Sequence, residues 1–338
     1  MARMESAAAR MHACGRCNGF DGLRLALASG VVAFHSFTLT HGSADGMPPM
    51  VQAAVRLILP AFFALSGFLV AGSLARAGSL REFLLLRLLR LLPGLSLVVV
   101  ATALLLGPLL TELPLRGYLR DPLLPLYFRN VWGQAEFALP GLFLHNPRAG
   151  VVNGALWTIP LEMACYSALA CLALLPLRRL TLLVLAVILL VPGLASAGQD
   201  LFASFALGVL CFAFRASLPL HPLAGLASLL AALLLAYWFA YMPLVAIPLA
   251  YGVVWLGCRR LPAWAARGDY SYGLYLCAYP LQQALLVLMP GQSWMGNLAA
   301  GWLLSLGCAM LLWHGMERPV LDRKHELLAR LGGRLARA

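Results

Sequence analysis

The sequence has little charge and almost no lysine. Only 11% of its 338 residues are Asp, Glu, Lys or Arg, and Lys324 is the single lysine. A soluble domain carries about 25% charged residues, and no polar stretch of this chain is long enough to form one. This composition excludes an ordinary soluble protein. Because 62% of the residues are hydrophobic and the mean hydropathy is +0.83, we predict an all-α, polytopic integral membrane protein.

The chain also lacks a cleavable signal pattern, internal repeats and a complete metal motif. Residues 1–20 contain arginines but no apolar core, so we expect a short cytoplasmic tail. Cys14 and Cys17 form a Cys-x-x-Cys pair, which is half of a zinc site, but no second pair completes it. We therefore predict no bound metal. Matching interrupted helices in two halves, which are typical of secondary transporters, are absent too.

About ten apolar segments are long enough, or nearly so, to span a membrane. The net charge of +12 comes largely from arginines between these segments, which is typical of membrane topology rather than of nucleic-acid binding. If the N-terminus is cytoplasmic, most basic residues fall on the inner side, so we predict that both termini are cytoplasmic. Residues 111–153 are then a long extracytoplasmic loop, and residues 320–338 a basic tail. The segments are approximately 22–41, 52–74, 87–110, 154–175, 179–195, 200–214, 222–240, 243–258, 271–289 and 297–315.

The predicted loop 111–153 mixes arginines and carboxylates with many aromatic residues. One interpretation is an interfacial aromatic belt with snorkelling arginines. The other is an outward-facing acceptor surface, because aromatic faces and polar edges suit sugars, and connections of this length are usually functional when they lack secondary structure. The residues on which both interpretations depend include Tyr118, Tyr127, Phe128, Trp132, Phe143 and Arg148.

The apolar run from Asp21 to His35 carries Arg24 near its start and His35 deep inside. These two residues are eleven positions apart, which is about three helical turns, so both project from one face and lie ~16 Å apart. Ionisable groups inside a membrane helix are costly and indicate function. Glu162 is the only carboxylate that we place well inside a segment, at a depth similar to that of His35.

A carboxylate beside an imidazole fixes its tautomer and stabilises the imidazolium, which would be the role of Glu162 toward His35. The alternative is a hydrogen bond that serves helix packing alone. Thr158, Glu162 and Tyr166 share one helix face at i, i+4 spacing.

Arg87 and Arg90 share a face at i, i+3 spacing just before an apolar run. With Arg24 they predict a basic cluster at the inner membrane face. This cluster either anchors the protein to lipid headgroups or recognises a phosphate-bearing ligand, because arginine binds phosphate in bidentate fashion. Ser66-Gly67 allows close approach of another backbone, either for packing or beside a substrate.

Six short motifs occur in order between residues 21 and 319. They are Asp21-Gly-Leu-Arg24 with His35, Phe62-Phe-Ala-Leu-Ser-Gly-Phe-Leu69, Arg87-Leu-Leu-Arg-Leu-Leu-Pro93, Asn153-Gly-Ala-Leu-Trp-Thr-Ile-Pro-Leu-Glu162 with Tyr166, Ser271-Tyr-Gly-Leu-Tyr-Leu276, and Glu317-Arg-Pro319. In this combination the chain resembles the acyltransferase 3 family of integral membrane acyltransferases.

The resemblance implies a transmembrane domain over residues 21–319 in the inner membrane of a bacterium. Such a protein moves an acyl group, usually acetyl, from cytoplasmic acyl-CoA such as acetyl-CoA to a hydroxyl of an extracytoplasmic glycan or glycolipid. By this resemblance the essential pair is Arg24 and His35, with His35 as general base or, in a variant, as carrier of a covalent acyl group. The further site candidates are Arg87 and Arg90 for the donor, Glu162 beside the histidine, and Trp157, Tyr166 and Ser66 for substrate.

Two departures and two alternatives accompany the resemblance. Ala278 stands where many members carry a histidine, and we expect no fused extracytoplasmic domain, so one polypeptide or a partner must handle both substrates. The alternatives are a transporter or flippase for a glycolipid or acylated metabolite, and a subunit of a biosynthetic complex. Expected partners are acyl-CoA, a carbohydrate or glycolipid acceptor, membrane lipids and a possible second copy of the chain, but no nucleic acid.

Overall fold

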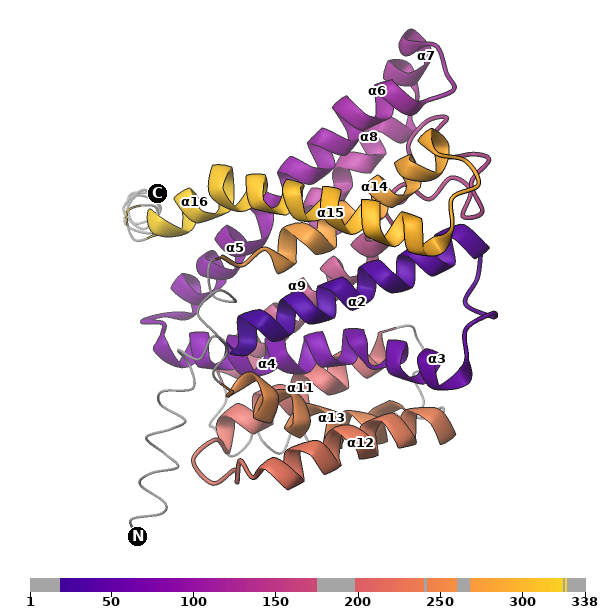
Figure 1. Cartoon of the computed structure of the whole chain (residues 1–338). Coiled ribbons are helices and arrows are strands. Elements are labelled where there is room, and N and C mark those ends of the chain that lie inside the picture. The colour runs from indigo at the N-terminus through magenta and orange to yellow at the C-terminus, as the bar shows by residue number, and fades with distance from the viewer. Residues whose placement is uncertain (1–18, 175–197, 240–241, 260–267, 325, 327–338) are drawn as a thin grey trace. The chain divides into compact units, whose positions relative to one another are not determined.

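The computed structural model describes residues 19–174, 198–239, 242–259, 268–324 and 326, and within these ranges the chain is helical and contains no strand (Figure 1). The predicted all-α class is therefore confirmed for this part of the protein. Cys14, Cys17, the predicted segment 179–195 and most of both predicted tails (residues 1–18, 325 and 327–338) lie outside it. In its described residues, every other predicted segment falls mainly on helix, and segment 52–74 is divided between two helices at Leu57.

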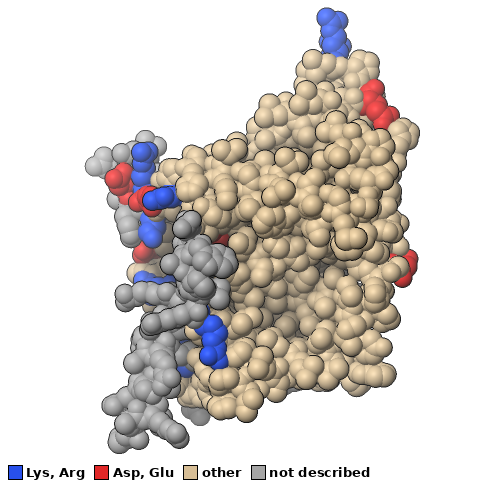
Figure 2. All heavy atoms as spheres, viewed as in Figure 1, with Lys and Arg blue, Asp and Glu red and all other residues tan. Residues whose placement is uncertain are grey.

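Five helical stretches are long and apolar enough to cross a membrane, namely Gly19–His41, Pro49–Arg76, Leu80–Leu110, Gly154–Leu172 and Trp294–Asp322. Three apolar helices are shorter, at Gln199–Ala213, Pro222–Trp238 and Leu244–Gly257. Large apolar side chains such as Leu109 and Leu311 are more than 70% exposed. The visible surface in the space-filling view is almost entirely uncharged, with charged side chains at its margins (Figure 2). Exposed apolar surface of this extent is typical of a protein that faces lipid, so the chain is an integral membrane protein.

The chain packs as two compact units, which we name unit 1 and unit 2. Helices α2 (Gly19–His41) and α9 (Thr158–Leu172) each contribute to both units. Unit 1 comprises residues 1–27, 47–80 and 161–268, and unit 2 comprises residues 28–46, 81–160 and 269–338.

Unit 1 is organised by close contact between two glycine-bearing helices, α4 (Ile58–Arg76) and α11 (Gln199–Ala213). A Cβ on Gly67 would lie 2.0 Å from the Phe205 carbonyl oxygen, and one on Gly208 would lie 2.0 Å from that of Ala64. Small residues allow helices to approach this closely in membranes. The predicted close backbone approach at Ser66-Gly67 is confirmed. The other helices described in unit 1 are α3 (Pro49–Arg56), α12 (Pro222–Trp238) and α13 (Met242–Gly257).

Unit 2 contains α5 (Leu80–Ala101), α14 (Ser271–Leu288) and α15 (Trp294–Leu312). Helix α14 packs against α15, where a Cβ on Gly273 would lie 2.8 Å from the Ala309 Cα. Both long helical runs pass through a π-helical turn, at η1 (Thr102–Leu106) before α6 (Gly107–Leu110) and at η5 (Trp313–Glu317) before α16 (Arg318–Asp322). Single π turns occur frequently at functional sites.

The loop 111–153 contains short helices rather than a structureless connection. They are α7 (Leu115–Arg120), α8 (Leu123–Tyr127) and the 3-10 turn η2 (Phe128–Trp132). Tyr118 is fully buried and its hydroxyl donates to the Ala103 carbonyl at 2.6 Å, and burial raises the pKa of Tyr118 to about 12. Tyr127 and Phe143 are buried too, whereas Trp132 is 77% exposed. Tyr118, Tyr127 and Phe143 therefore form local core and do not belong to an aromatic belt or an acceptor surface, whereas both interpretations stay predictions for Phe128 and Trp132.

Candidate active site

His35 lies on the part of α2 that belongs to unit 2, and its ring meets an aromatic side chain of α14. The edge of one ring faces the other in a T-shaped contact with Tyr279, with centroids 4.9 Å apart and planes at 77°. The Nδ1 atom of His35 is buried, and no residue in the described part of the chain hydrogen bonds to it. The orientation of this imidazole is therefore set here by ring packing.

Gln282 fixes α2 against α14 on both sides of His35. Its side-chain amide donates to the Val32 carbonyl at 2.9 Å and to the Ser36 hydroxyl. Gln282 is fully buried, and its own backbone carbonyl accepts a bond of 3.1 Å from the amide of Asn297 on α15. An amide bonded inside an apolar bundle holds helices in one register.

The motif that begins at Asn153 packs against the same helix. The Asn153 side chain donates to the Leu276 carbonyl at 2.9 Å and accepts from the Ala155 amide as the cap of η3 (Gly154–Trp157). The Tyr275 hydroxyl lies 2.7 Å from the Thr158 hydroxyl. A Cβ on Gly154 would come 2.7 Å from the Tyr279 ring, so only glycine leaves room for that ring.

Gln283 ties the end of the loop to α14 beside these contacts. Its amide donates to the Arg148 carbonyl at 2.9 Å and to the Val151 carbonyl at 2.7 Å, and its oxygen accepts from Asn146 at 2.8 Å. The positive charge of Arg148 acts on both His35 and Tyr279. Unit 2 therefore brings one loop cation into electrostatic range of the histidine.

Arg90 is held by two carboxylates, which form with it a cluster that we name the arginine clamp. Its guanidinium donates to Glu317 in η5 and to Asp269, which lies two residues before the start of α14. The Tyr272 ring lies 5.4 Å from the guanidinium, and the Tyr272 hydroxyl donates to the Leu91 carbonyl at 2.8 Å. With one cation and two carboxylates, the clamp has a net negative charge when all three groups are ionised.

Glu317 corrects one expectation from the sequence. Glu162 is not the only carboxylate inside a helical span, because Glu317 is 2% exposed within the stretch Trp294–Asp322. Gly94 makes room for it, since a Cβ there would lie 2.8 Å from the Glu317 oxygen. Its charge is offset by Arg90, which is how a buried carboxylate is normally retained.

The other predicted residues lie as follows. Tyr166 donates to Glu162 on α9, which confirms that these two side chains share a helix face. Glu162 belongs to unit 1 and His35 to unit 2, so their pairing stays a prediction. Arg24 and Arg87 are likewise divided between the units, and the predicted three-arginine cluster stays a prediction as well.

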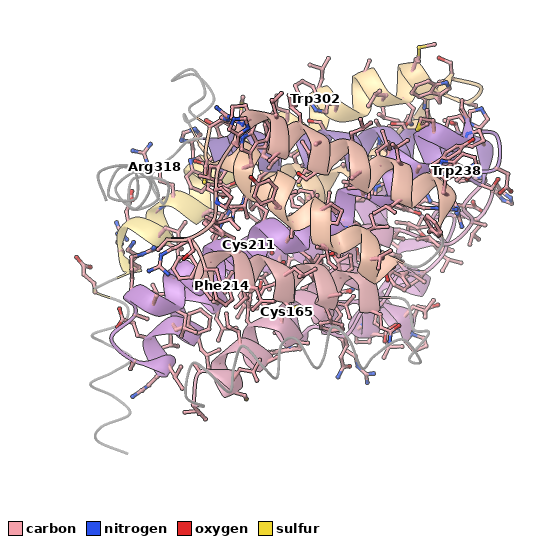
Figure 3. The ribbon with its side chains drawn as sticks, turned by 90° about the horizontal axis from the view of Figure 1, so that it is seen from below. Cys165, Cys211, Phe214, Trp238, Trp302 and Arg318 are labelled. Atoms are coloured by element: carbon pink, nitrogen blue, oxygen red, sulfur yellow. The ribbon has the colours of Figure 1, made fainter. Side chains whose placement is uncertain are left out.

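The two remaining substrate candidates are partly exposed. Trp157 ends η3 in unit 2, and Ser66 lies on α4 in unit 1. Within the described ranges no group of three or more His, Cys, Asp or Glu side chains could hold a metal ion. Cys165 (labelled in Figure 3) is buried and unbonded to another cysteine.

Several short motifs thus converge within unit 2 from distant parts of the sequence. Arg90 of the third meets Glu317 of the sixth, and Tyr272 of the fifth donates to the backbone of the third at Leu91. Asn153 of the fourth bonds the backbone at Leu276. The family model of the acyltransferase domain (Acyl_transf_3) matches residues 18–314. The chain belongs to the acyltransferase 3 family.

Membership of this family makes the protein a membrane acyltransferase, as the resemblance of its motifs implies. A curated protein of Shigella phage Sf6, named O-acetyl transferase, is 27% identical over 293 residues, which cover 80% of this chain and 86% of that protein. No solved structure matches the chain significantly.

Four residues of the candidate site have no place among the residues predicted from the sequence, namely Asp269, Tyr279, Gln282 and Gln283. Two adjacent glutamines inside the apolar segment 271–289 were the available signal, because polar side chains in a span must find partners. Asp269 lies just before that segment, where a carboxylate is common and does not by itself indicate a site. Ala278, in place of the family histidine, is buried and precedes Tyr279.

Proposed function

We propose that the protein transfers an acetyl group from cytoplasmic acetyl-CoA, or another acyl-CoA, to a hydroxyl of an extracytoplasmic or lipid-linked glycan. The convergence of the motifs around α14 in unit 2, next to His35, is the observation that carries this proposal. The name of the phage relative supports acetyl as the group and oxygen as the acceptor atom.

His35 acts as the general base. The acceptor hydroxyl gives its proton to the imidazole while its oxygen attacks the thioester carbonyl, and the C–S bond then breaks to release the CoA thiolate. The imidazolium returns the proton to that thiolate, so the histidine ends the cycle neutral. The carboxylate of Glu162 takes the role of stabilising the imidazolium, and Arg148 lies on the acceptor side. In the variant mechanism the acyl group passes through His35 covalently.

The donor phosphates bind at the cytoplasmic end of α2 and α5. Arg24 and Arg87 supply the charge-assisted hydrogen bonds. We assign Arg90 a supporting role in this donor site rather than direct phosphate contact, because the arginine clamp offsets its charge with two carboxylates. Trp157, Tyr166 and Ser66 line the path of the acyl and acceptor groups.

The protein lies in the inner membrane of a bacterium, with ten spans and both termini cytoplasmic. This topology lets the Arg24 end of α2 face cytoplasmic acyl-CoA, while the acceptor reaches His35 from the loop side. Membrane lipids surround the spans, and a second copy of the chain is a possible partner.

The test combines an assay in vitro with analysis of glycans from cells. The purified protein in nanodiscs is supplied with isotope-labelled acetyl-CoA and a lipid-linked glycan extract, and products are read by mass spectrometry. We expect an acetylated glycan and release of free CoA, and cells without the protein should lose the acetylated species. Movement of an unmodified glycolipid across the bilayer, without an acetylated product, would support a flippase instead.

A further inference from the structure

An imidazole that acts as a base needs a fixed orientation, and in many hydrolases a carboxylate supplies it through a hydrogen bond. His35 is arranged differently in unit 2, because its buried Nδ1 has no hydrogen-bond partner among the described residues. The closer of its two aromatic contacts is the T-shaped one with Tyr279 at 4.9 Å, and the other is a tilted contact with the adjacent Phe34 at 5.8 Å on the same helix. Edge-to-face contacts of this kind have a preferred geometry, because the positive edge of one ring meets the negative face of the other.

Tyr279 is itself held in place on its other side. It is 7% exposed and packs with Leu39 of α2 and Ala155 of η3 in one small apolar cluster. Gly154 forms the floor under its ring, since a Cβ there would overlap the ring at 2.7 Å. Tyr279 therefore contacts η3 on one side and the His35 ring on the other, so a shift of η3 would change the orientation of the histidine ring.

Gln282, three residues after Tyr279 on α14, fixes the backbone that carries the histidine. Its two bonds to α2 reach the residues three before and one after His35, namely Val32 and Ser36. Helix α14 thus fixes the position of α2 at His35 through Gln282 and the orientation of the His35 ring through Tyr279.

We propose that Tyr279 is a positioning residue for His35. Gly154 leaves the space in which the Tyr279 ring packs. The proposal rests on the role of His35 in the proposed function. The aromatic ring is the part that acts, so a phenylalanine can replace the tyrosine and a branched aliphatic side chain cannot.

The test compares Tyr279→Phe and Tyr279→Leu in the nanodisc assay, with Tyr237→Leu on the exposed face of α12 as the control. We expect kcat of Tyr279→Leu to fall on the order of 10- to 100-fold, the loss typical of a misplaced reacting group. The KM for acetyl-CoA should stay within about twofold, since the tyrosine makes no donor contact, and Tyr279→Phe should keep kcat within about threefold of wild type. Tyr237→Leu should match wild type.

A second variant covers the case in which Tyr279→Leu fails to fold. Gly154→Ala pushes against the ring without deleting it, and we expect the same fall in kcat with KM unchanged, whereas Gly307→Ala on α15, where a Cβ meets nothing within 4 Å, should have no effect. The proposal is overturned if kcat survives in both Tyr279→Leu and Gly154→Ala, or if Tyr279→Phe is as impaired as the leucine variant. If His35→Gln loses activity while Tyr279→Leu keeps the wild-type kcat, the positioning role of Tyr279 is contradicted and the proposed function stands. Full activity in His35→Gln would instead contradict the proposed function, in which His35 is the general base.

Discussion

Arg90 of α5 and Glu317 of η5 form an ion pair between two motifs that are 227 residues apart in the sequence. The carboxylate side chain is 2% exposed and the guanidinium side chain 22% exposed. Asp269 completes the clamp from the start of α14. The clamp therefore joins the middle of α5, the residues just before α14 and the π turn η5 after α15 inside unit 2.

The clamp predicts an order of stability losses. Arg90→Ala leaves two carboxylates without their cation, and breaking a buried pair by removing one partner costs about 3–5 kcal/mol. Glu317→Gln should cost less, because Arg90 keeps Asp269. Arg318→Ala is the matched control, since its pair with Asp322 is exposed and 3.7 Å long and is worth at most about 1 kcal/mol.

Thermal unfolding in detergent, followed by tryptophan fluorescence, measures this order. We expect Tm to fall most for Arg90→Ala, less for Glu317→Gln and hardly at all for Arg318→Ala. Equal Tm values for Arg90→Ala and Arg318→Ala would contradict the structural role of the clamp.

The paired glycines of unit 1 give a second prediction. Gly67→Ala and Gly208→Ala each place a methyl group 2.0 Å from a backbone carbonyl oxygen, so α4 and α11 must separate. We expect each variant to lose a few kcal/mol of stability, in the range of overpacked cores, about 1–3 kcal/mol. The control Gly307→Ala is also helical but meets no neighbour, and it should be neutral or stabilising by up to about 1 kcal/mol. Thermal unfolding of the three variants tests this packing. Equal Tm values for Gly67→Ala, Gly208→Ala and Gly307→Ala would contradict it.

Donor binding gives a third prediction. Arg24→Ala or Arg87→Ala removes a charge-assisted hydrogen bond worth about 1.5–3 kcal/mol, so the apparent affinity for acetyl-CoA should fall roughly 10- to 100-fold. Arg116→Ala, at an exposed position of α7, is the control and should leave the affinity unchanged. Titration of acetyl-CoA by microscale thermophoresis measures these constants, and unaltered affinity in both Arg24→Ala and Arg87→Ala would exclude the proposed phosphate site.

The positions of the helices follow from the sequence, because long apolar runs in a membrane protein have few alternatives to the helix. The Gly67 contact was predictable as well, since Ser-Gly within an apolar run indicates close packing. The surroundings of His35 were not predictable in this way. Its contact with Tyr279 and the bonds from Gln282 depend on tertiary packing between α2 and α14, which no local pattern encodes.

The partners of charged and aromatic residues depend on tertiary packing in the same way. The spacing of Arg87 and Arg90 predicts contact with lipid headgroups or with phosphate, and it gives no sign of the carboxylate partners of Arg90, because Asp269 and Glu317 are distant in sequence. The loop aromatics Tyr118 and Tyr127 were interpreted as surface groups because their burial depends on short helices that hydropathy does not predict.

The central claim is that His35 moves the proton during acyl transfer. The most direct measurement is acetyl transfer by purified His35→Gln in nanodiscs, with wild type and the exposed control Arg318→Ala in parallel. Loss of a general base typically slows turnover on the order of 10²- to 10⁴-fold. We predict a loss of this size with acetyl-CoA affinity and Tm retained, and turnover of His35→Gln at the wild-type rate would contradict the account.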